Sequence, residues 1–186
     1  MRIGSSSISV EGVVVRFSAI RLTNTRTTGE LLAQQQMSLS SGGLDLIKGF
    51  EGYRDKVYND VAGNPTIGYG HLIKKGEDFS KGITEPQASA LLAQDAQGAV
   101  NAVNSNLTAS VSQNQFDALV SFTYNVGAQG FANSTLLANI NSGKDVTLGN
   151  FTAWDHAGGK EVAALTRRRT SEYNLFSKGT TRADSP

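Results

Sequence analysis

Apolar residues recur at helical spacing through much of the second half of the chain. The clearest case follows Thr84, which can cap a helix, with Pro86 in the first turn and Gln87 at the capping-box position. Leucine, alanine and valine then return every three or four residues along the segment. This pattern predicts one long helix from Thr84 to about Asn104.

More helices are expected further along the chain. Ser112 is a typical residue at the start of a helix, and Gly127 and Gly143 are typical of positions where a helix ends. Between and after these residues the helical spacing of apolar positions continues. The predicted helices cover residues 113–127, 135–140 and 161–176.

The middle of the chain has a different pattern. Residues 44–50 fit a short helix with one apolar face. Residues 55–72 have runs of strand-forming residues on either side of a turn that contains Gly63 and Asn64. A small antiparallel sheet followed by several helices is an α+β fold, with a cleft expected between a β lobe and a helical lobe.

The first 43 residues differ from the rest of the chain. In Val10–Leu22, β-branched and bulky residues are interleaved with Ser and Arg, which favours one or two strands. Ser38–Gly43, with the sequence SLSSGG, is typical of a flexible joint. We expect an N-terminal extension with its linker over residues 1–43, a folded domain over 44–178 and a polar tail over 179–186.

Composition excludes several classes of protein. The chain has 186 residues, of which 39% are hydrophobic and 18% charged, as in globular domains. The net charge of +1 gives no reason to expect nucleic-acid binding. There is neither a run of ~18 apolar residues that could span a membrane nor a recognisable signal peptide. With no cysteine and only two histidines, no disulfide, metal site or cofactor is expected.

Candidate chemistry lies in the stretch FEGYRDKVYNDVAGNPTIGYGHL, residues 50–72. Glu51 follows the short predicted helix directly, Asp60 precedes the turn, and Thr66 lies in the following strand. Hydrolysis of a glycosidic bond needs an acid for the leaving oxygen and a second carboxylate. Partial burial would keep Glu51 protonated, a polar turn would keep Asp60 ionised, and the Thr66 hydroxyl can orient a water. The spacing alone is a weak signal for this chemistry.

The surrounding residues make the signal specific. FEGYRDKVYND followed by GNPTIGYGH resembles the catalytic signature of the phage-type lysozymes, glycoside hydrolase family 24. The resemblance continues through FDALVSFTYNVG, STLLANIN and WDHAGGKEVAALTRRRTSEYNLF, and covers about Leu44 to Lys178. It implies a lysozyme-like fold. It also implies Glu51 as the general acid, Asp60 as the carboxylate that activates or stabilises, and Thr66 as the hydroxyl that positions water.

Two further sets of residues are expected to support that centre. His71 is expected to make structural hydrogen bonds near the junction of the lobes. The resemblance implies that one arginine of the run 167–169 approaches Glu51. Successive helical residues point in different directions, so the three cannot all reach one site. Spacing leaves open which of Arg167, Arg168 and Arg169 this is, and Arg167 and Arg168 are named as candidates for the support of Glu51. Such an arginine would favour the ionised form of Glu51 and oppose the effect of burial.

Three residues are candidates for a sugar-binding groove. Tyr124, Asn125 and Trp154 belong to the YNVG and WDHAGG segments, and aromatic and amide side chains suit the apolar and polar faces of sugars. Core packing is the alternative role for Trp154, and helix capping is the alternative for Asn125.

The resemblance implies a muramidase that cleaves the β-1,4 bond between N-acetylmuramic acid and N-acetylglucosamine in peptidoglycan, with inversion and without a metal. One alternative is a lytic transglycosylase, which needs a single acid and an internal sugar hydroxyl. The other is a virion-associated module that binds the wall or serves assembly. The expected site of synthesis is the host cytoplasm and the expected site of action is the cell wall, in the periplasm or from outside. Access would come from holin-dependent release or from a virion partner bound by residues 1–43.

Overall fold

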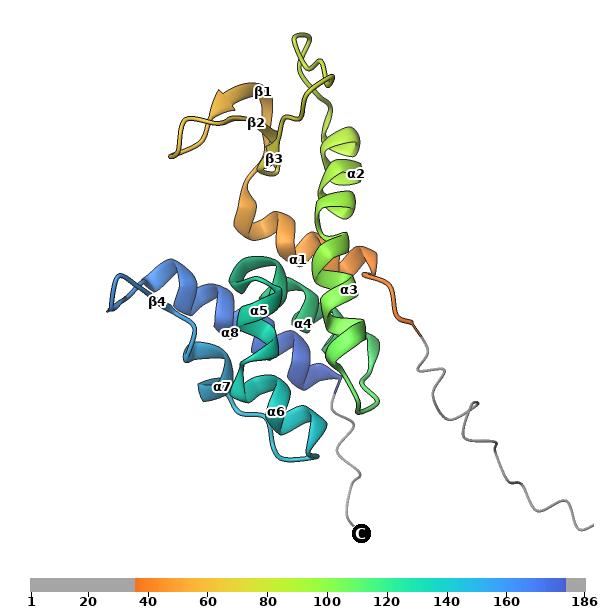
Figure 1. The fold of residues 1–186 in the computed structure, drawn as a ribbon, viewed down its shortest axis with the longest axis vertical. Helices are drawn as coiled ribbons and strands as arrows, with labels where there is room; N and C mark the ends of the chain where they lie inside the picture. The colour runs from red at the N-terminus through yellow and green to blue at the C-terminus, as the bar shows by residue number, and fades with distance from the viewer. Residues whose placement is uncertain (1–35, 180–186) are drawn as a thin grey trace, which may run out of the picture. The chain divides into compact units, whose positions relative to one another are not determined.

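The computed structural model describes residues 36–179, which belong to one compact unit (Figure 1). The strands expected over Val10–Leu22 and the tail after Gly179 lie outside the described residues. Within them, a small antiparallel sheet is combined with a larger set of helices. The predicted α+β class is therefore confirmed.

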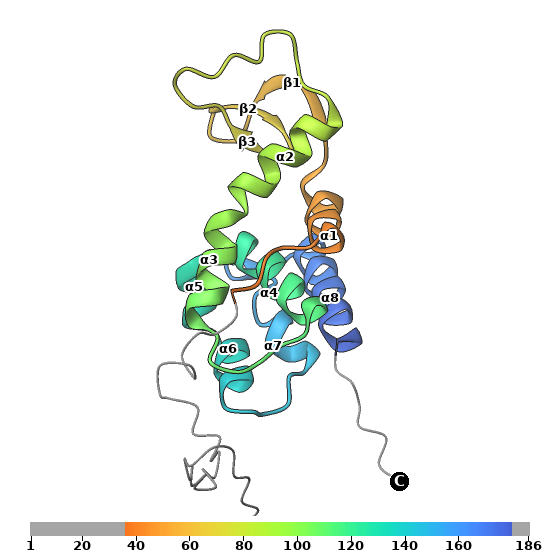
Figure 2. The same cartoon turned by 90° about the vertical axis from the view of Figure 1, so that its right-hand side faces the viewer.

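The sheet lies at one end of the described unit, beside helix α2 (Figure 2). Its strands pair antiparallel in sequence order and are β1 (Arg54–Asn59), β2 (Pro65–Gly68) and β3 (His71–Leu72). Tyr58 pairs with Thr66 across β1 and β2. Gly68 adopts a φ of 66°, and a Cβ there would lie 3.0 Å from the Cβ of Ala88 in α2. Glycine at this position thus permits the close approach of α2 to the sheet.

The rest of the described chain consists of helices joined by loops, together with one short hairpin. The helices are α1 (Ser41–Glu51), α2 (Glu85–Asp95), α3 (Gln97–Asn106), α4 (Gln113–Val126), α5 (Ala128–Ala132), α6 (Thr135–Asn141), α7 (Leu148–Thr152) and α8 (Ala163–Lys178). The hairpin consists of β4 (His156–Ala157) and β5 (Lys160–Glu161). The helices predicted after Ser112 and over 135–140 are confirmed. The helix predicted over 161–176 begins two residues later and ends at Lys178.

The prediction of one long helix from Thr84 to Asn104 is wrong in one respect, because the structure has two helices there, divided at Ala96. Thr84 and Gln87 do form the expected capping box at its start. Ala96, however, has a ψ of −11°, well away from the helical value near −42°. Its N–H donates to the carbonyls of both Leu92 and Gln94, so the turn tightens locally and a new helix, α3, begins at Gln97.

The core is organised around α4, which packs against α1, α3, α5 and α8. All residues of α4 from Phe116 to Thr123 are buried. Phe122 makes edge-to-face contacts with Phe131, Phe151 and Trp154, with ring centroids 6.5, 5.7 and 6.0 Å away. This arrangement of aromatic rings is favourable beyond the burial of their area. Helix α4 is therefore the support on which α1 and α8 are placed.

The segment Ser38–Gly43 is not a flexible joint, contrary to expectation. Ser40 caps α1, and residues 41–43 form the first turn of that helix. The buried carboxylate of Asp117 in α4 accepts hydrogen bonds from the backbone N–H of Ser40 at 3.0 Å and from its hydroxyl at 2.5 Å. Ser40 is here a helix cap, and Gly43 is a small residue at a close contact between helices. Composition alone does not distinguish such a segment from a Ser/Gly-rich linker.

Candidate active site

Glu51 is the last residue of α1 and lies directly before the sheet. Gly52 follows with a φ of 72°, a conformation that glycine adopts readily, and this ends the helix and directs the chain into β1. The Glu51 side chain is 25% exposed, and its Oε1 accepts a hydrogen bond of 2.7 Å from Nη1 of Arg168. The carboxylate is thus held at the helix end and still accessible.

The arginine that reaches Glu51 is Arg168. Arg168 and Arg169 are buried, whereas Arg167 on the same turn is exposed and forms no ion pair within the described residues. The supporting role expected for Arg167 is therefore not borne out by its position. Arg169 donates a 2.7 Å hydrogen bond to Oδ1 of Asn125 instead. As the helical geometry predicted, the three side chains point in different directions.

Asp60 closes the turn between β1 and β2. Its Oδ1 accepts from the N–H of Ala62 at 2.9 Å and from the N–H of Asn64 at 2.8 Å, and its Oδ2 accepts from Nδ2 of Asn64 at 3.2 Å. These hydrogen bonds, with the backbone of Asn64 contributing most, lower the pKa of Asp60. Asp60 is therefore an ionised carboxylate in a fixed orientation, in agreement with the polar environment expected from the sequence.

Thr66 lies in β2 opposite Tyr58, and only 2% of it is exposed. Its hydroxyl donates to the carbonyl of Asn64 at 3.0 Å. Because Asn64 also binds Asp60, the turn that orients the carboxylate is tied to the same strand that carries Thr66. The donated proton leaves the lone pairs of the Thr66 oxygen free to accept a hydrogen bond.

His71 makes the structural hydrogen bonds that were expected of it. Nδ1 lies 2.8 Å from Oδ2 of Asp95, and Nε2 lies 3.0 Å from Oε2 of Glu77. Burial disfavours the charged ring, but the hydrogen bonds to Glu77 and Asp95 outweigh it and raise the pKa of His71. The residue links β3 to the end of α2 and to the loop between them, and makes no contact with Glu51.

The sugar-groove candidates occupy different environments. Tyr124 is half-buried, and burial together with the negative charges of Glu51 and Asp95 raises its pKa to about 12. The side chain of Asn125 is bound to Arg169, so it serves a buried ion cluster. Trp154 packs edge-on against Phe122 and over Gly130, which matches the core-packing alternative. Of the three, Tyr124 is the one placed within the electrostatic reach of Glu51.

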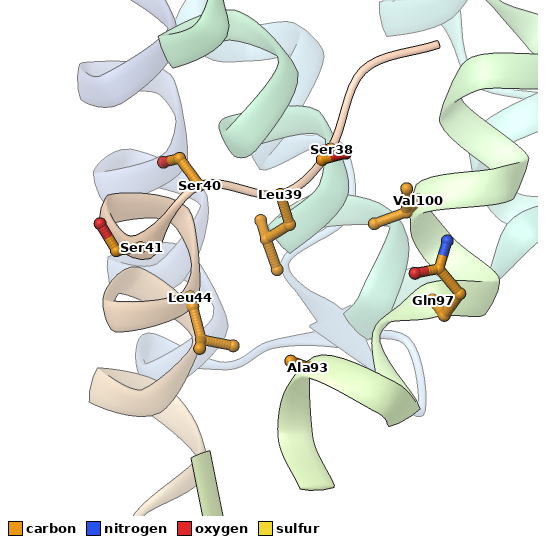
Figure 3. A pocket seen from close by; sticks show the side chains of 8 residues that line it. All are labelled: Ser38, Leu39, Ser40, Ser41, Leu44, Ala93, Gln97 and Val100. Carbon is orange, nitrogen blue, oxygen red and sulfur yellow. The ribbon is translucent and has the colours of Figure 1, made fainter. Parts of the chain in front are cut away.

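A cavity of about 180 Å³ lies at the start of α1, away from these residues (Figure 3). It is lined by Ser38–Ser41, Leu44 and three residues of α2 and α3. None of Glu51, Asp60 and Thr66 contributes to it. Within residues 36–179 no cluster of His, Asp or Glu could hold a metal ion, and no helix there is long and apolar enough to cross a membrane.

Residues that complete the site were missed in the sequence. Glu172 and Ser121 are fully buried, and both contact Arg168. Oε1 of Glu172 lies 3.2 Å from Nε of Arg168, and the carbonyl of Ser121 lies 3.4 Å from Nη2. The sequence does contain one indication of this pair, because Glu172 lies four residues after Arg168, a spacing that allows an ion pair on a helix. The other polar residues of α8, however, favour the interpretation of this helix face as exposed to solvent.

Comparison with known proteins places this geometry in a family. The phage lysozyme family model matches residues 48–172. The endolysin of Bacillus phage PZA is 45% identical over 149 residues, which are 77% of this chain and 57% of that protein. This chain therefore spans little more than half the length of that relative.

Two further relatives are matched over almost their whole length. The endolysin of Salmonella phage P22 is 39% identical over 144 residues, covering 75% of this chain and 98% of that protein. The structure of the muramidase domain of SpmX from Asticaccaulis excentricus is 38% identical, with a TM-score of 0.66, covering 75% of this chain and 97% of that domain. By sequence and by structure, the chain belongs to the phage lysozyme family.

Proposed function

We propose that the chain is a muramidase, which hydrolyses the β-1,4 bond between N-acetylmuramic acid and N-acetylglucosamine in peptidoglycan. The observation that carries the proposal is the carboxylate of Glu51 at the end of α1, bound by the buried Arg168, in a chain of the phage lysozyme family. The similarity to a domain named as a muramidase supports the same substrate class.

Glu51 is assigned the role of general acid. It is accessible enough to meet a glycosidic oxygen, since a quarter of its side chain is exposed. Arg168 holds the carboxyl group in one orientation while the proton moves to the leaving oxygen. General acid catalysis by a group held in this way contributes ~10²- to 10⁴-fold in rate.

Asp60 and Thr66 are assigned the role of binding and activating the attacking water. Each oxygen of a carboxylate has two lone-pair sites, and Oδ2 of Asp60 accepts from the side chain of Asn64 alone among the described residues. It can therefore accept a proton from an attacking water. The Thr66 oxygen, whose proton is donated to Asn64, can accept the second hydrogen of that water. Attack from the face opposite the leaving group would invert the anomeric carbon.

The assignment is tested with purified peptidoglycan and the variants Asp60→Asn and Thr66→Ala. We expect each to lower the rate of hydrolysis by ~10²- to 10⁴-fold, because each removes a group that binds the attacking water. Asp55→Asn is the matched control, since Asp55 is an exposed carboxylate of the same hairpin and makes no side-chain hydrogen bond within the described residues. An Asp60→Asn enzyme as active as the control would remove Asp60 from the mechanism.

The reaction class is tested by mass spectrometry of the fragments released in ¹⁸O-labelled water. A hydrolase yields reducing ends that carry the label, whereas a transglycosylase yields unlabelled 1,6-anhydro ends. The anomer formed first, observed by NMR, distinguishes inversion from retention.

We further propose that the protein acts on the bacterial cell wall in lysis. Its route to the wall is proposed to be holin-dependent release or attachment to a phage particle through residues 1–43. Comparing wall lysis and particle binding by the full chain and by residues 36–186 tests this route, because the described residues 36–179 belong to one compact unit.

A further inference from the structure

Glu172 is a buried carboxylate that the proposed reaction does not use. It lies in α8, has no exposed surface, and accepts a 2.8 Å hydrogen bond from the hydroxyl of Ser121 in α4. An ionised group without water is very costly unless it is paired. Here both partners are cations of its own helix. Its Oε1 accepts from Nε of Arg168 at 3.2 Å, and its Oε2 lies 3.2 Å from Nε of Arg169 in an ionic contact without hydrogen-bond geometry.

Every nitrogen of the Arg168 guanidinium has a partner. Nε donates to Glu172, Nη2 lies 3.4 Å from the carbonyl of Ser121, and Nη1 donates to Glu51. The face of the group lies over the ring of Phe50, with Cζ 5.1 Å from the centroid. Because a guanidinium is planar and rigid, fixing Nε and Nη2 on one side determines where Nη1 points.

We propose that Glu172 is a positioning residue, which with Ser121 orients Arg168 so that its Nη1 meets the carboxylate of Glu51. The proposal rests on the proposed function, since it assigns Glu172 to the support of the acid. Glu172 acts through Arg168 and does not touch the substrate. The chain of contacts runs from α4 through α8 to the end of α1, and so couples the acid to the core of the helical lobe.

The balance of charge supports the same role. The charged groups that act on this cluster are Glu51 from α1, Arg168 and Arg169 from α8, and Asp155 from the segment after α7, while Tyr124 of α4 is neutral. Burial raises the pKa of Glu172, and Arg169, Ser121 and Arg168 oppose that rise. Without Glu172, two adjacent buried arginines would have, among the described residues, only Glu51 and Asp155 as nearby counter-charges. Nε of Arg168 would then lose its partner, and the contacts of Nη1 with Glu51 and of Nη2 with the Ser121 carbonyl would be left to hold the group.

The test compares Glu172→Gln with Asp145→Asn, which replaces an exposed carboxylate that has no side-chain partner within the described residues. Glu172→Gln keeps the size of the side chain and a group that can bind Ser121, but removes the charge that holds Nε of Arg168. We expect kcat for peptidoglycan to fall about 10- to 100-fold with KM changed less than about twofold, because the acid is misplaced while the sugar contacts remain. Asp145→Asn is expected to leave both constants unchanged.

A second readout does not depend on catalysis. The Nε–Hε NMR signal of Arg168, assigned by its loss in Arg168→Lys, is expected to exchange with solvent about 10-fold faster in Glu172→Gln than in the original chain. If peptidoglycan is not hydrolysed by the original chain, the proposed function fails, and the exchange rate still tests the positioning role.

Ser121→Ala is the milder variant for the case in which Glu172→Gln does not fold. It retains all charges but releases Oε1 of Glu172 from α4, and we expect a smaller loss of kcat, of about 3- to 10-fold, with KM unchanged. Unchanged kcat and an unchanged Hε exchange rate in a folded variant of either kind would overturn the proposal. A fall in kcat accompanied by an equal rise in KM would also overturn it, since that result indicates lost sugar binding.

Discussion

Replacement of Gly43 by alanine tests how closely α1 is held against α4. A Cβ at Gly43 would lie 2.6 Å from Cγ of Asp117 and 2.6 Å from Cδ1 of Leu39. Carbon atoms in contact normally lie ~3.5 to 4.0 Å apart, so either the side chain of Asp117 or the whole helix must move. Since Asp117 also holds Ser40, the perturbation affects the cap of the helix that carries Glu51.

The magnitude follows from a matched pair of substitutions in the same helix. Gly49→Ala introduces a Cβ with nothing within 4 Å, so the higher helix propensity of alanine should raise the free energy of unfolding by about 0.5 to 1 kcal/mol. Gly43→Ala gains the same amount from helix propensity, but overpacking should lower the free energy of unfolding by about 1 to 3 kcal/mol. The propensity terms cancel in the comparison, and the expected difference between the two variants is therefore about 1 to 3 kcal/mol.

The difference is measured by thermal or urea unfolding of both variants and the original chain. For a protein of this size, each kcal/mol corresponds to roughly 2–4 °C in Tm. We expect Gly49→Ala to unfold at a higher temperature than the original and Gly43→Ala at a lower one. If Gly43→Ala proves as stabilising as Gly49→Ala, the tight contact between α1 and Asp117 is not present in solution.

Three further predictions concern ionisable groups. The pKa of His71 is raised in the folded protein. The stability that this residue contributes is therefore present below its unfolded pKa near 6.5 and is lost as pH rises through the folded pKa. Urea unfolding across that pH range should show this loss in the original chain and not in His71→Gln. The hydrogen bond from Lys48, with those from Ser89 and Tyr69, lowers the pKa of Glu85 to about 2. Stability from Glu85 is therefore present above the ordinary value and lost as pH falls toward 2, a loss that Glu85→Gln should reduce. Tyr124, whose pKa is raised to about 12 by burial and by Glu51 and Asp95, should be missing from the tyrosines that ionise near pH 10 in an ultraviolet titration, and Tyr124→Phe should remove only the late phase.

The helices and the sheet could be predicted because their local signals agree with the final packing. The capping boxes that begin at Thr84 and Ser112 are formed as the sequence indicates. Helices α5 and α7, with five residues each, are too short to show a recurring apolar pattern, although Thr147 and Asn150 form a capping box at the start of α7. Both helices pack through Phe131 and Phe151 against Phe122, and Phe151 lies far along the chain from Phe122.

In the candidate site, too, local sequence motifs could be predicted and contacts between distant residues could not. The motif around Glu51, Asp60 and Thr66 is local, so the sequence alone names these residues as catalytic candidates, and their role stays a prediction. The choice of Arg168 over Arg167 depends on which face of α8 meets α4 and α1, which spacing did not settle. Glu172 was overlooked because charged residues on a helix usually lie in solvent, and here the ion pairs with Arg168 and Arg169 allow its burial.

Glu51→Gln is the most direct test of the central claim that Glu51 is the acid of a peptidoglycan hydrolase. Glutamine keeps the size of the side chain and can still accept a hydrogen bond from Arg168, but it cannot supply the proton. Lysis of purified cell walls is measured for this variant beside the original chain, with Tm as the check on folding. We predict that lysis is abolished while Tm remains within a few degrees of the original, and a folded Glu51→Gln variant with near-normal lysis would contradict the assignment.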